Sequence, residues 1–263
     1  MDRIENIDFC IRYLLKQNHA QAEIPCKLRD KRQLLRALMN IWHPQALSEE
    51  FLHAQDGELQ AQLSDKGVVH LRHIAEPGHS PFASPAIPIL WQGDITRLKV
   101  DAIVNAANSR GLGCWHPLHA CIDNAIHSAA GLQLRQECNR ILQGETIATG
   151  GAIITPGYNL PAKWVIHTVG PIIAAEAPIT GEEEQLAGCY RSSLYLAKEH
   201  GCRSIAFCCI STGEFHFPNR RAAEVAIRTV RGFYHSSHYP IKVVFNVFKD
   251  IDYDIYRELL AAR

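Results

Sequence analysis

Two cysteines and two histidines stand close together in residues 114–121, directly after a glycine-rich turn. Thiolate sulfur and imidazole nitrogen are ligands that zinc accepts readily, so Cys114, Cys121 and one histidine can close on a single ion. His116 and His119 are both candidates, because spacing alone does not separate them. Three protein ligands with an open fourth position are typical of a catalytic zinc rather than a structural one. The alternative is a chance cluster in a chain with nine cysteines and 14 histidines.

A loop of small and aromatic residues, 210–218, follows a predicted strand and precedes a helix that begins near Asn219. Gly213 lets the backbone approach a ligand closely, and backbone amides beside a helix N-terminus suit a phosphate. Phe215 and Phe217 can pack on a sugar or a base. The loop lacks the lysine of a P-loop. An ordinary strand-to-helix turn with aromatic packing is therefore the alternative.

Polar residues also stand at the ends of other predicted elements. Asn105 and Asn108 come at the end of an apolar strand, where their amides suit sugar hydroxyls or an amide-bearing base. Capping a turn is the commoner role of asparagine. Asp123 begins a predicted helix, whose N-terminus favours the ionised carboxylate. It is either a capping residue or a base beside the metal.

The elements that must position these residues alternate in the second part of the chain. Short apolar, β-branched runs predict strands at 87–91, 102–104, 152–155, 164–169, 204–210 and 243–248. Longer amphipathic runs predict helices at 121–142, 182–200, 219–233 and 252–261. This alternation predicts an α/β sandwich, with helices on both faces of a largely parallel sheet. Ligands bind such sheets at the carboxyl ends of strands, which is where the polar residues stand.

Residues 1–76 are predicted to form a helical N-terminal extension. Apolar residues recur at helical spacing from Ile4 to Leu15, and Asp30 and Ser48 are predicted to cap a second and a third helix. We expect a helical cap docked on the main domain rather than a separate functional module. Four prolines lie in residues 77–88, which predicts a linker there and the main domain at 89–263.

The composition argues against several classes of partner. Lysine plus arginine equals aspartate plus glutamate at 27 each, so the chain has no general attraction for nucleic acid or anionic lipid. No apolar run reaches the ~18 residues of a transmembrane helix. The N-terminus lacks the pattern of a signal peptide. A cytoplasmic location is therefore expected, where disulfides are rare and clustered cysteine and histidine indicate a metal site.

Together these motifs resemble the macrodomain family, and specifically its zinc-dependent microbial branch. Residues 100–108, 165–171 and 210–218 are similar to the signature strand and turn, the central strand and the second phosphate loop. Residues 121–127 stand where hydrolytic relatives carry a glycine-rich loop that ends in a catalytic aspartate. In the zinc-dependent branch that loop is replaced by cysteine, four residues, histidine, one residue, cysteine. Cys114, His119 and Cys121 match this pattern.

The resemblance spans roughly residues 85–250, and the helical extension also looks like that branch. It implies a three-layer α/β/α macrodomain with a mixed, largely parallel sheet. It also favours His119 over His116 and implies one Zn²⁺ per chain.

The resemblance further implies an ADP-ribose site. The carboxylate of Asp94 would contact the adenine amino group, with the backbone of Ile95 beside it, and Asn108 would bind the distal ribose. Phe215 would lie against the distal ribose. The diphosphate would be cradled by the backbone amides of two segments, Cys121, Ile122 and Asp123 in the first and Ser211, Thr212, Gly213, Glu214 and Phe215 in the second.

The implied activity is a zinc-dependent, glycosidase-type hydrolase that removes mono-ADP-ribose from proteins by cleaving the bond between the distal ribose and a side chain. Asp123 would orient the attacking water or take its proton. A sirtuin-like ADP-ribosyltransferase would be the opposing enzyme, and neither nucleic acid nor a membrane is an expected partner. Three alternatives stay open: a reader that binds ADP-ribose without turnover, a hydrolase of a free ADP-ribose derivative, and a zinc that only rigidifies the loop.

Overall fold

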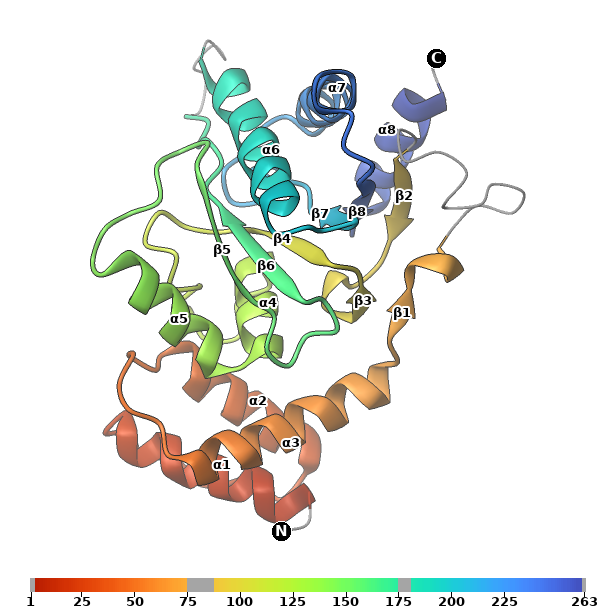
Figure 1. The fold of residues 1–263 in the computed structure, drawn as a ribbon. Coiled ribbons are helices and arrows are strands. Elements are labelled where there is room, and N and C mark those ends of the chain that lie inside the picture. Colours follow the sequence, from red (N-terminus) through yellow and green to blue (C-terminus); the bar gives the residue numbers. More distant parts are fainter. Residues whose placement is uncertain (1–2, 75–87, 175–180, 262–263) are drawn as a thin grey trace.

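The computed structural model describes residues 3–74, 88–174 and 181–261. Its centre is a six-stranded sheet with the strand order β2-β8-β7-β4-β6-β5 (Figure 1). The strands are β2 (Ile89–Gln92), β4 (Ala102–Ala106), β5 (Ala152–Pro156), β6 (Trp164–Thr168), β7 (Ser204–Phe207) and β8 (Lys242–Val247). All neighbours are parallel except β5, which runs antiparallel to β6 at the edge of the sheet.

Helices cover both faces of this sheet. On one face α4 (Ile122–Ala130) contacts β4 and α5 (Leu132–Leu142) contacts β5. On the other face α6 (Glu182–Glu199), α7 (Asn219–Ser237) and α8 (Asp250–Ala261) pack side by side (Figure 1). Every residue of β7 and β8 is buried, as expected for strands covered on both faces. The predicted three-layer fold with a mixed, largely parallel sheet is confirmed.

The N-terminal extension consists of α1 (Arg3–Gln17), α2 (Leu28–Asn40) and α3 (Glu49–Lys66). These helices share a hydrophobic core of their own, which Leu132 of α5 joins. They lie against the α4 and α5 side of the molecule (Figure 1). The predicted domain boundaries stay predictions, and most of the predicted linker at 77–88 falls outside the described residues.

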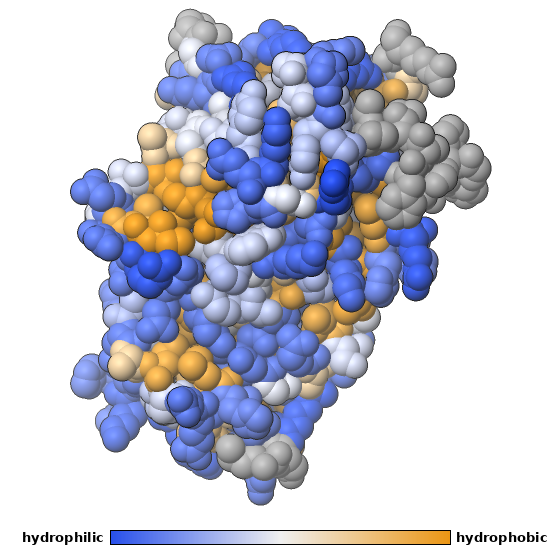
Figure 2. Space-filling model, viewed as in Figure 1, coloured by the Kyte–Doolittle hydropathy of each residue, from blue (hydrophilic) through white to orange (hydrophobic). Residues whose placement is uncertain are grey.

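Short elements connect the extension to the sheet. After α3, β1 (Val69–His70) leads into the 3-10 helix η1 (Leu71–His73) and pairs in parallel with β3 (Leu98–Lys99). A second 3-10 helix, η2 (Ile95–Arg97), precedes β3. The face of the molecule drawn in Figure 2 is mostly hydrophilic, with apolar side chains gathered in separate patches. Among the described helices, none is long and apolar enough to cross a membrane.

Several local predictions need correction. The helix predicted at 121–142 is two helices, because Gly131 between them has φ +97°, a conformation that L side chains rarely adopt. Asp30 does not cap α2: it lies in the first turn, and Lys27 holds the N-cap position. β7 ends three residues before the predicted end of its strand. The Ser48 cap is confirmed, since its side chain accepts a hydrogen bond from the amide of Phe51 at 3.2 Å.

Candidate metal centre and ligand cleft

A cleft of about 1270 Å³ opens at the carboxyl ends of β4, β7 and β8. The loops after these strands form one wall, and side chains of α2 and α3 form another. Every residue of the implied ADP-ribose and metal sites lines this cleft: Asp94, Ile95, Asn108, Cys114, His119, Cys121, Ile122, Asp123, Ser211, Thr212, Gly213, Glu214 and Phe215. The roles of these residues stay predictions, but the fold brings all of them to one place. Two further candidates do not line it, because Asn105 and Phe217 are buried, and their predicted contacts with a sugar or a base were wrong.

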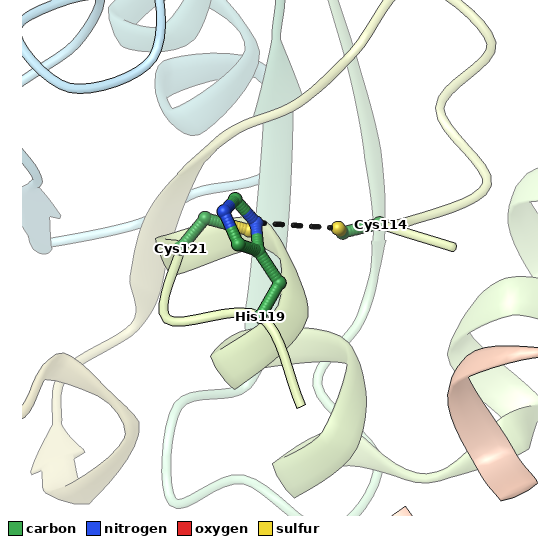
Figure 3. Close-up of side chains that lie close together, drawn as sticks. All are labelled: Cys114, His119 and Cys121. Carbon is green, nitrogen blue, oxygen red and sulfur yellow. Dashed lines mark hydrogen bonds between the residues drawn. The ribbon is translucent and has the colours of Figure 1, made fainter. Parts of the chain in front are cut away.

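Cys114, His119 and Cys121 form a compact group in which the possible ligand atoms all lie within 4.8 Å of one another. Figure 3 shows the three side chains pointing toward one another, with Cys121 at the start of α4. Cys114 Sγ lies 3.6 Å from His119 Nδ1. Bonds of ~2.3 Å to sulfur and ~2.0 Å to nitrogen give an S···N separation of ~3.5 Å around a tetrahedral zinc. The donor set and its spacing therefore fit zinc, and His119 rather than His116 belongs to the group.

The local sequence explains how the loop brings these ligands together. Gly113 has φ +80°, and a Cβ there would lie 2.7 Å from the ring of His127, so only glycine fits. Cys121 is the N-cap of α4, where its Sγ accepts a hydrogen bond from the amide of Asn124 at 3.4 Å. Burial raises the pKa of the Cys121 thiol to about 12. A metal that binds here must therefore displace the thiol proton.

Asp123 lies two residues beyond this group, on the first turn of α4, and is 5% exposed. Asn105 Nδ2 donates to its Oδ1 at 2.7 Å, and Asn108 Nδ2 donates to its Oδ2 at 3.3 Å. Burial raises the pKa of Asp123 to about 6, although both amide hydrogen bonds oppose the shift. A carboxylate with this pKa can take up a proton near neutral pH, which suits a general base.

A buried polar network behind Asp123 holds it in place. Asn105 Nδ2 also lies 3.2 Å from His167 Nδ1, and His167 Nε2 lies 3.0 Å from the hydroxyl of Thr155. Burial lowers the pKa of His167 to about 3, so its ring is neutral and needs no counter-charge. His127 Nε2 lies 3.5 Å from Asp123 Oδ1 but makes no hydrogen bond within the described residues, so His127 packs beside this network, and burial lowers its pKa as well.

Sequence reasoning assigned no role to His127 or His167. Asn105 and His167 are register partners on the adjacent strands β4 and β6. Two polar residues inside otherwise apolar central strands were the signal that could have found this network.

Unpaired backbone amides line the middle of the cleft. Within the described residues, the amides of Gly213, Glu214 and Phe215 donate no backbone hydrogen bond, and neither do those of Ile122 and Asp123 at the N-terminus of α4. Such amides are the donors that bind a phosphate at a helix N-terminus or in a turn. The two predicted phosphate segments therefore face one cleft.

The second segment is tightly built around Ser211, which has φ +65°. A Cβ on Gly170 would lie 2.0 Å from Ser211 Oγ, so the loop packs directly against the backbone that follows β6.

Comparison with known proteins shows the family of this chain. The Macro domain family model matches residues 104–226. A Protein-ADP-ribose hydrolase from Treponema medium is 46% identical over 269 residues, which cover 99% of this chain and 100% of the relative. The chain belongs to the macrodomain family.

Other relatives of this macrodomain include a Protein-ADP-ribose hydrolase from Staphylococcus aureus strain MSSA476, which is 43% identical over 266 residues, 98% of this chain and 97% of the relative. The Oceanobacillus iheyensis macrodomain with ADP is 41% identical with a TM-score of 0.58, over 65% of this chain and 88% of that one. The Trypanosoma brucei macrodomain in complex with ADP-ribose is 32% identical with a TM-score of 0.65, over 86% of this chain and 94% of that one.

The far end of the macrodomain cleft carries Asp94. One of its oxygens accepts hydrogen bonds from the amide and hydroxyl of Thr96, and the other lies 3.6 Å from Lys66 of α3. Asn246 Nδ2 donates to the carbonyl of Gly93 at 2.9 Å and fixes this turn against β8. Phe248 follows β8, lines the cleft and is 78% exposed. The sequence analysis assigned Phe248 no contact with a ligand, because it placed this residue inside the predicted strand at 243–248.

Proposed function

We propose that this macrodomain is a zinc-dependent hydrolase that removes mono-ADP-ribose from modified proteins. One observation carries the proposal: Cys114, His119 and Cys121 lie at the same end of the cleft as the buried carboxylate of Asp123. Relatives that match nearly the whole chain at 46% and 43% identity are named Protein-ADP-ribose hydrolase.

ADP-ribose binding follows from the chemistry of the cleft. The free amides of the two loops suit the diphosphate, and the carboxylate of Asp94 suits the adenine amino group. Asn108, which donates a hydrogen bond to Asp123, would bind the distal ribose. Structures of relatives with ADP and with ADP-ribose support this class of ligand. In this proposed binding mode, the anomeric carbon of the distal ribose would lie near Asp123.

In the proposed reaction, water attacks the anomeric carbon and the bond from that carbon to the protein side chain breaks. Asp123 takes one proton of the attacking water, and the hydroxyl of that water stays on the anomeric carbon. The side-chain atom takes this proton back from Asp123 as it leaves, so the products are free ADP-ribose and the unmodified side chain. A zinc ion on Cys114, His119 and Cys121 would supply Lewis acidity beside the distal ribose. Two thiolates would formally balance the charge of this ion and weaken its power to acidify water, so orienting a ribose hydroxyl is the alternative role for it.

Two other functions remain as alternatives. A reader that binds ADP-ribose without turnover needs neither a basic residue at the anomeric carbon nor an open metal position, so the grouping of Asp123 with the three ligands favours a hydrolase. A hydrolase of a free ADP-ribose derivative would hold the ADP-ribose half in the same way. A sirtuin-like ADP-ribosyltransferase is the proposed opposing enzyme.

The test is hydrolysis of a mono-ADP-ribosylated protein by the purified chain, with metal content measured before and after chelation. We expect one zinc per chain, loss of activity on chelation and recovery on adding zinc. Full activity of the metal-free protein would refute the zinc role. Tight ADP-ribose binding with no turnover, zinc present, would favour the reader.

A further inference from the structure

The last turns of α2, in the N-terminal extension, face the loop that carries the proposed metal ligands. Arg36 Nη2 donates to the backbone carbonyl of His119 at 3.3 Å. Its Nε and Nη2 also donate to Asn124 Oδ1 at 3.0 and 2.6 Å, at the start of α4. Arg36 therefore ties the ligand His119 to the helix that Cys121 caps, although 83 residues separate it from His119 in the chain.

Asn40 makes a second contact from the same face of α2, since residues four apart lie one above the other on a helix. Its Oδ1 accepts a hydrogen bond from the amide of Leu118 at 3.0 Å, and its Nδ2 donates to Ser128 of α4 at 3.1 Å. Leu118 has φ +59°, a left-handed conformation that L side chains rarely adopt. The contact thus holds a strained residue directly before His119.

The end of α2 that carries these two side chains is itself anchored. The buried guanidinium of Arg135, on α5, donates to the backbone carbonyls of Met39, Asn40 and Trp42 at 3.2, 2.9 and 2.8 Å. Met39 and Asn40 end α2, where a helix leaves carbonyls without intrahelical partners, and the carbonyl of Met39 also accepts a hydrogen bond from the amide of Trp42 at 3.4 Å. The same guanidinium stacks 4.2 Å from the ring of Trp115. Trp115 belongs to residues 114–121, which carry the three proposed ligands and are called the metal loop below.

We propose that Arg36 is a positioning residue for the metal ligands, and that the helical extension is therefore a working part of the metal site rather than a cover. This inference rests on the proposed zinc function. Arg36 holds the carbonyl of His119 and the first turn of α4 in one geometry. The metal-free loop therefore already keeps the imidazole close to the thiols of Cys114 and Cys121.

The partners of Arg36 identify its role as geometric. Within the described residues it pairs with no carboxylate, and both of its hydrogen-bond acceptors are neutral oxygens that belong to the metal loop or to α4. A planar guanidinium can reach both acceptors at once with donors in a fixed fork, whereas a lysine ammonium cannot reproduce that fork.

The experiment compares the wild-type chain with Arg36→Gln, Arg36→Lys and a control, Arg12→Gln. Arg12 is an exposed arginine of the same extension, on α1. Zinc affinity is measured by competition with a chromophoric chelator, and hydrogen exchange of residues 115–120 is measured on the metal-free proteins. Partners that orient metal ligands are typically worth about 10–100-fold in metal affinity.

We expect Arg36→Gln to bind zinc at least about tenfold more weakly and to exchange its loop amides faster. Arg36→Lys should show the same defects in smaller measure, and Arg12→Gln should match the wild type. Should Arg36→Gln fail to fold, Arg36→Lys decides. Unchanged loop exchange in the Arg36 variants, or unchanged zinc affinity where the wild type binds zinc, overturns the inference. A wild type that takes up no zinc, with loop exchange still faster in the variants, contradicts the proposed zinc function and leaves the ordering role of Arg36 supported.

Discussion

Replacing Asp123 by asparagine should inactivate this protein and, at alkaline pH, stabilise it. The carboxylate is 5% exposed, and burial raises its pKa from the ordinary 3.8 to about 6. A carboxyl group whose pKa is higher in the folded state stabilises that state when it is protonated. This contribution is complete below the pKa of the unfolded chain, 3.8, and it is lost as the pH rises through about 6. At pH 8 the ionised side chain therefore costs the folded state up to about 3 kcal/mol.

Asparagine is neutral at every pH and removes this cost. One of its polar atoms would be an NH₂ group facing the amide of Asn105 or Asn108, which both donate to the carboxylate, and this mismatch costs about 1–2 kcal/mol. We expect a net gain of about 1–2 kcal/mol at pH 8, and the carboxylate cost itself falls by roughly half at pH 5. Hydrolysis should fall by about 10²–10⁴-fold, the usual contribution of a general base.

The assay is urea unfolding of metal-free wild type and Asp123→Asn at pH 8 and pH 5, beside hydrolysis of a mono-ADP-ribosylated protein. Asp101→Asn is the matched control. Burial raises the pKa of Asp101, but hydrogen bonds from Lys163, Arg203 and Ser204 outweigh burial and lower the pKa overall. That variant should lose stability at pH 8 rather than gain it. An Asp123→Asn protein that is equally destabilised at both pH values, or that keeps full activity, would refute the reasoning.

Three further substitutions probe the rest of the cleft. Glu214→Gln should weaken zinc binding about tenfold in a chelator competition, because Glu214 Oε1 lies 3.6 Å from His119 Nε2 and can orient the ring; unchanged affinity would argue against this. Gly170→Ala should lower ADP-ribose affinity at least about tenfold by calorimetry, because the new Cβ displaces Ser211 and its phosphate loop, whereas Gly232→Ala has open space and should bind normally. Phe248→Ala should raise the Kd for ADP-ribose about tenfold and leave kcat unchanged, because stacking of a base on an aromatic ring is worth ~1–3 kcal/mol. Ile251 is exposed but lies outside the cleft, so Ile251→Ala should leave the Kd unchanged.

Much of the fold could be predicted because its signals are local. The alternation of β-branched runs with amphipathic runs predicted the order of strands and helices. In a largely parallel sheet, only a few strand orders are compatible with that alternation. Ser48 caps its helix through an amide three residues away, so the cap is visible in the sequence. The two-helix outcome at 121–142 is also local in origin, but a glycine inside a helical pattern is often tolerated, and only the φ of Gly131 decides it.

The contacts that join distant segments could not be predicted in the same way. Whether Asn105 meets His167 depends on the register of β4 against β6, and a shift of one residue would turn both side chains to the other face. Lys66 lies beside Asp94 only because α3 and the turn after β2 are docked together.

By itself, the sequence determined the residue types of the metal loop and of the two phosphate segments, and their places after strands. Cys114, His119 and Cys121 are close in the chain, so a short loop keeps them within reach whatever the rest of the fold does. Tertiary structure alone decided that Arg36 reaches this loop, that Asp123 is buried and that α2 and α3 wall the cleft. Burial and contacts between distant segments depend on how whole helices and strands pack, and the spacing of residues within one segment does not determine that packing.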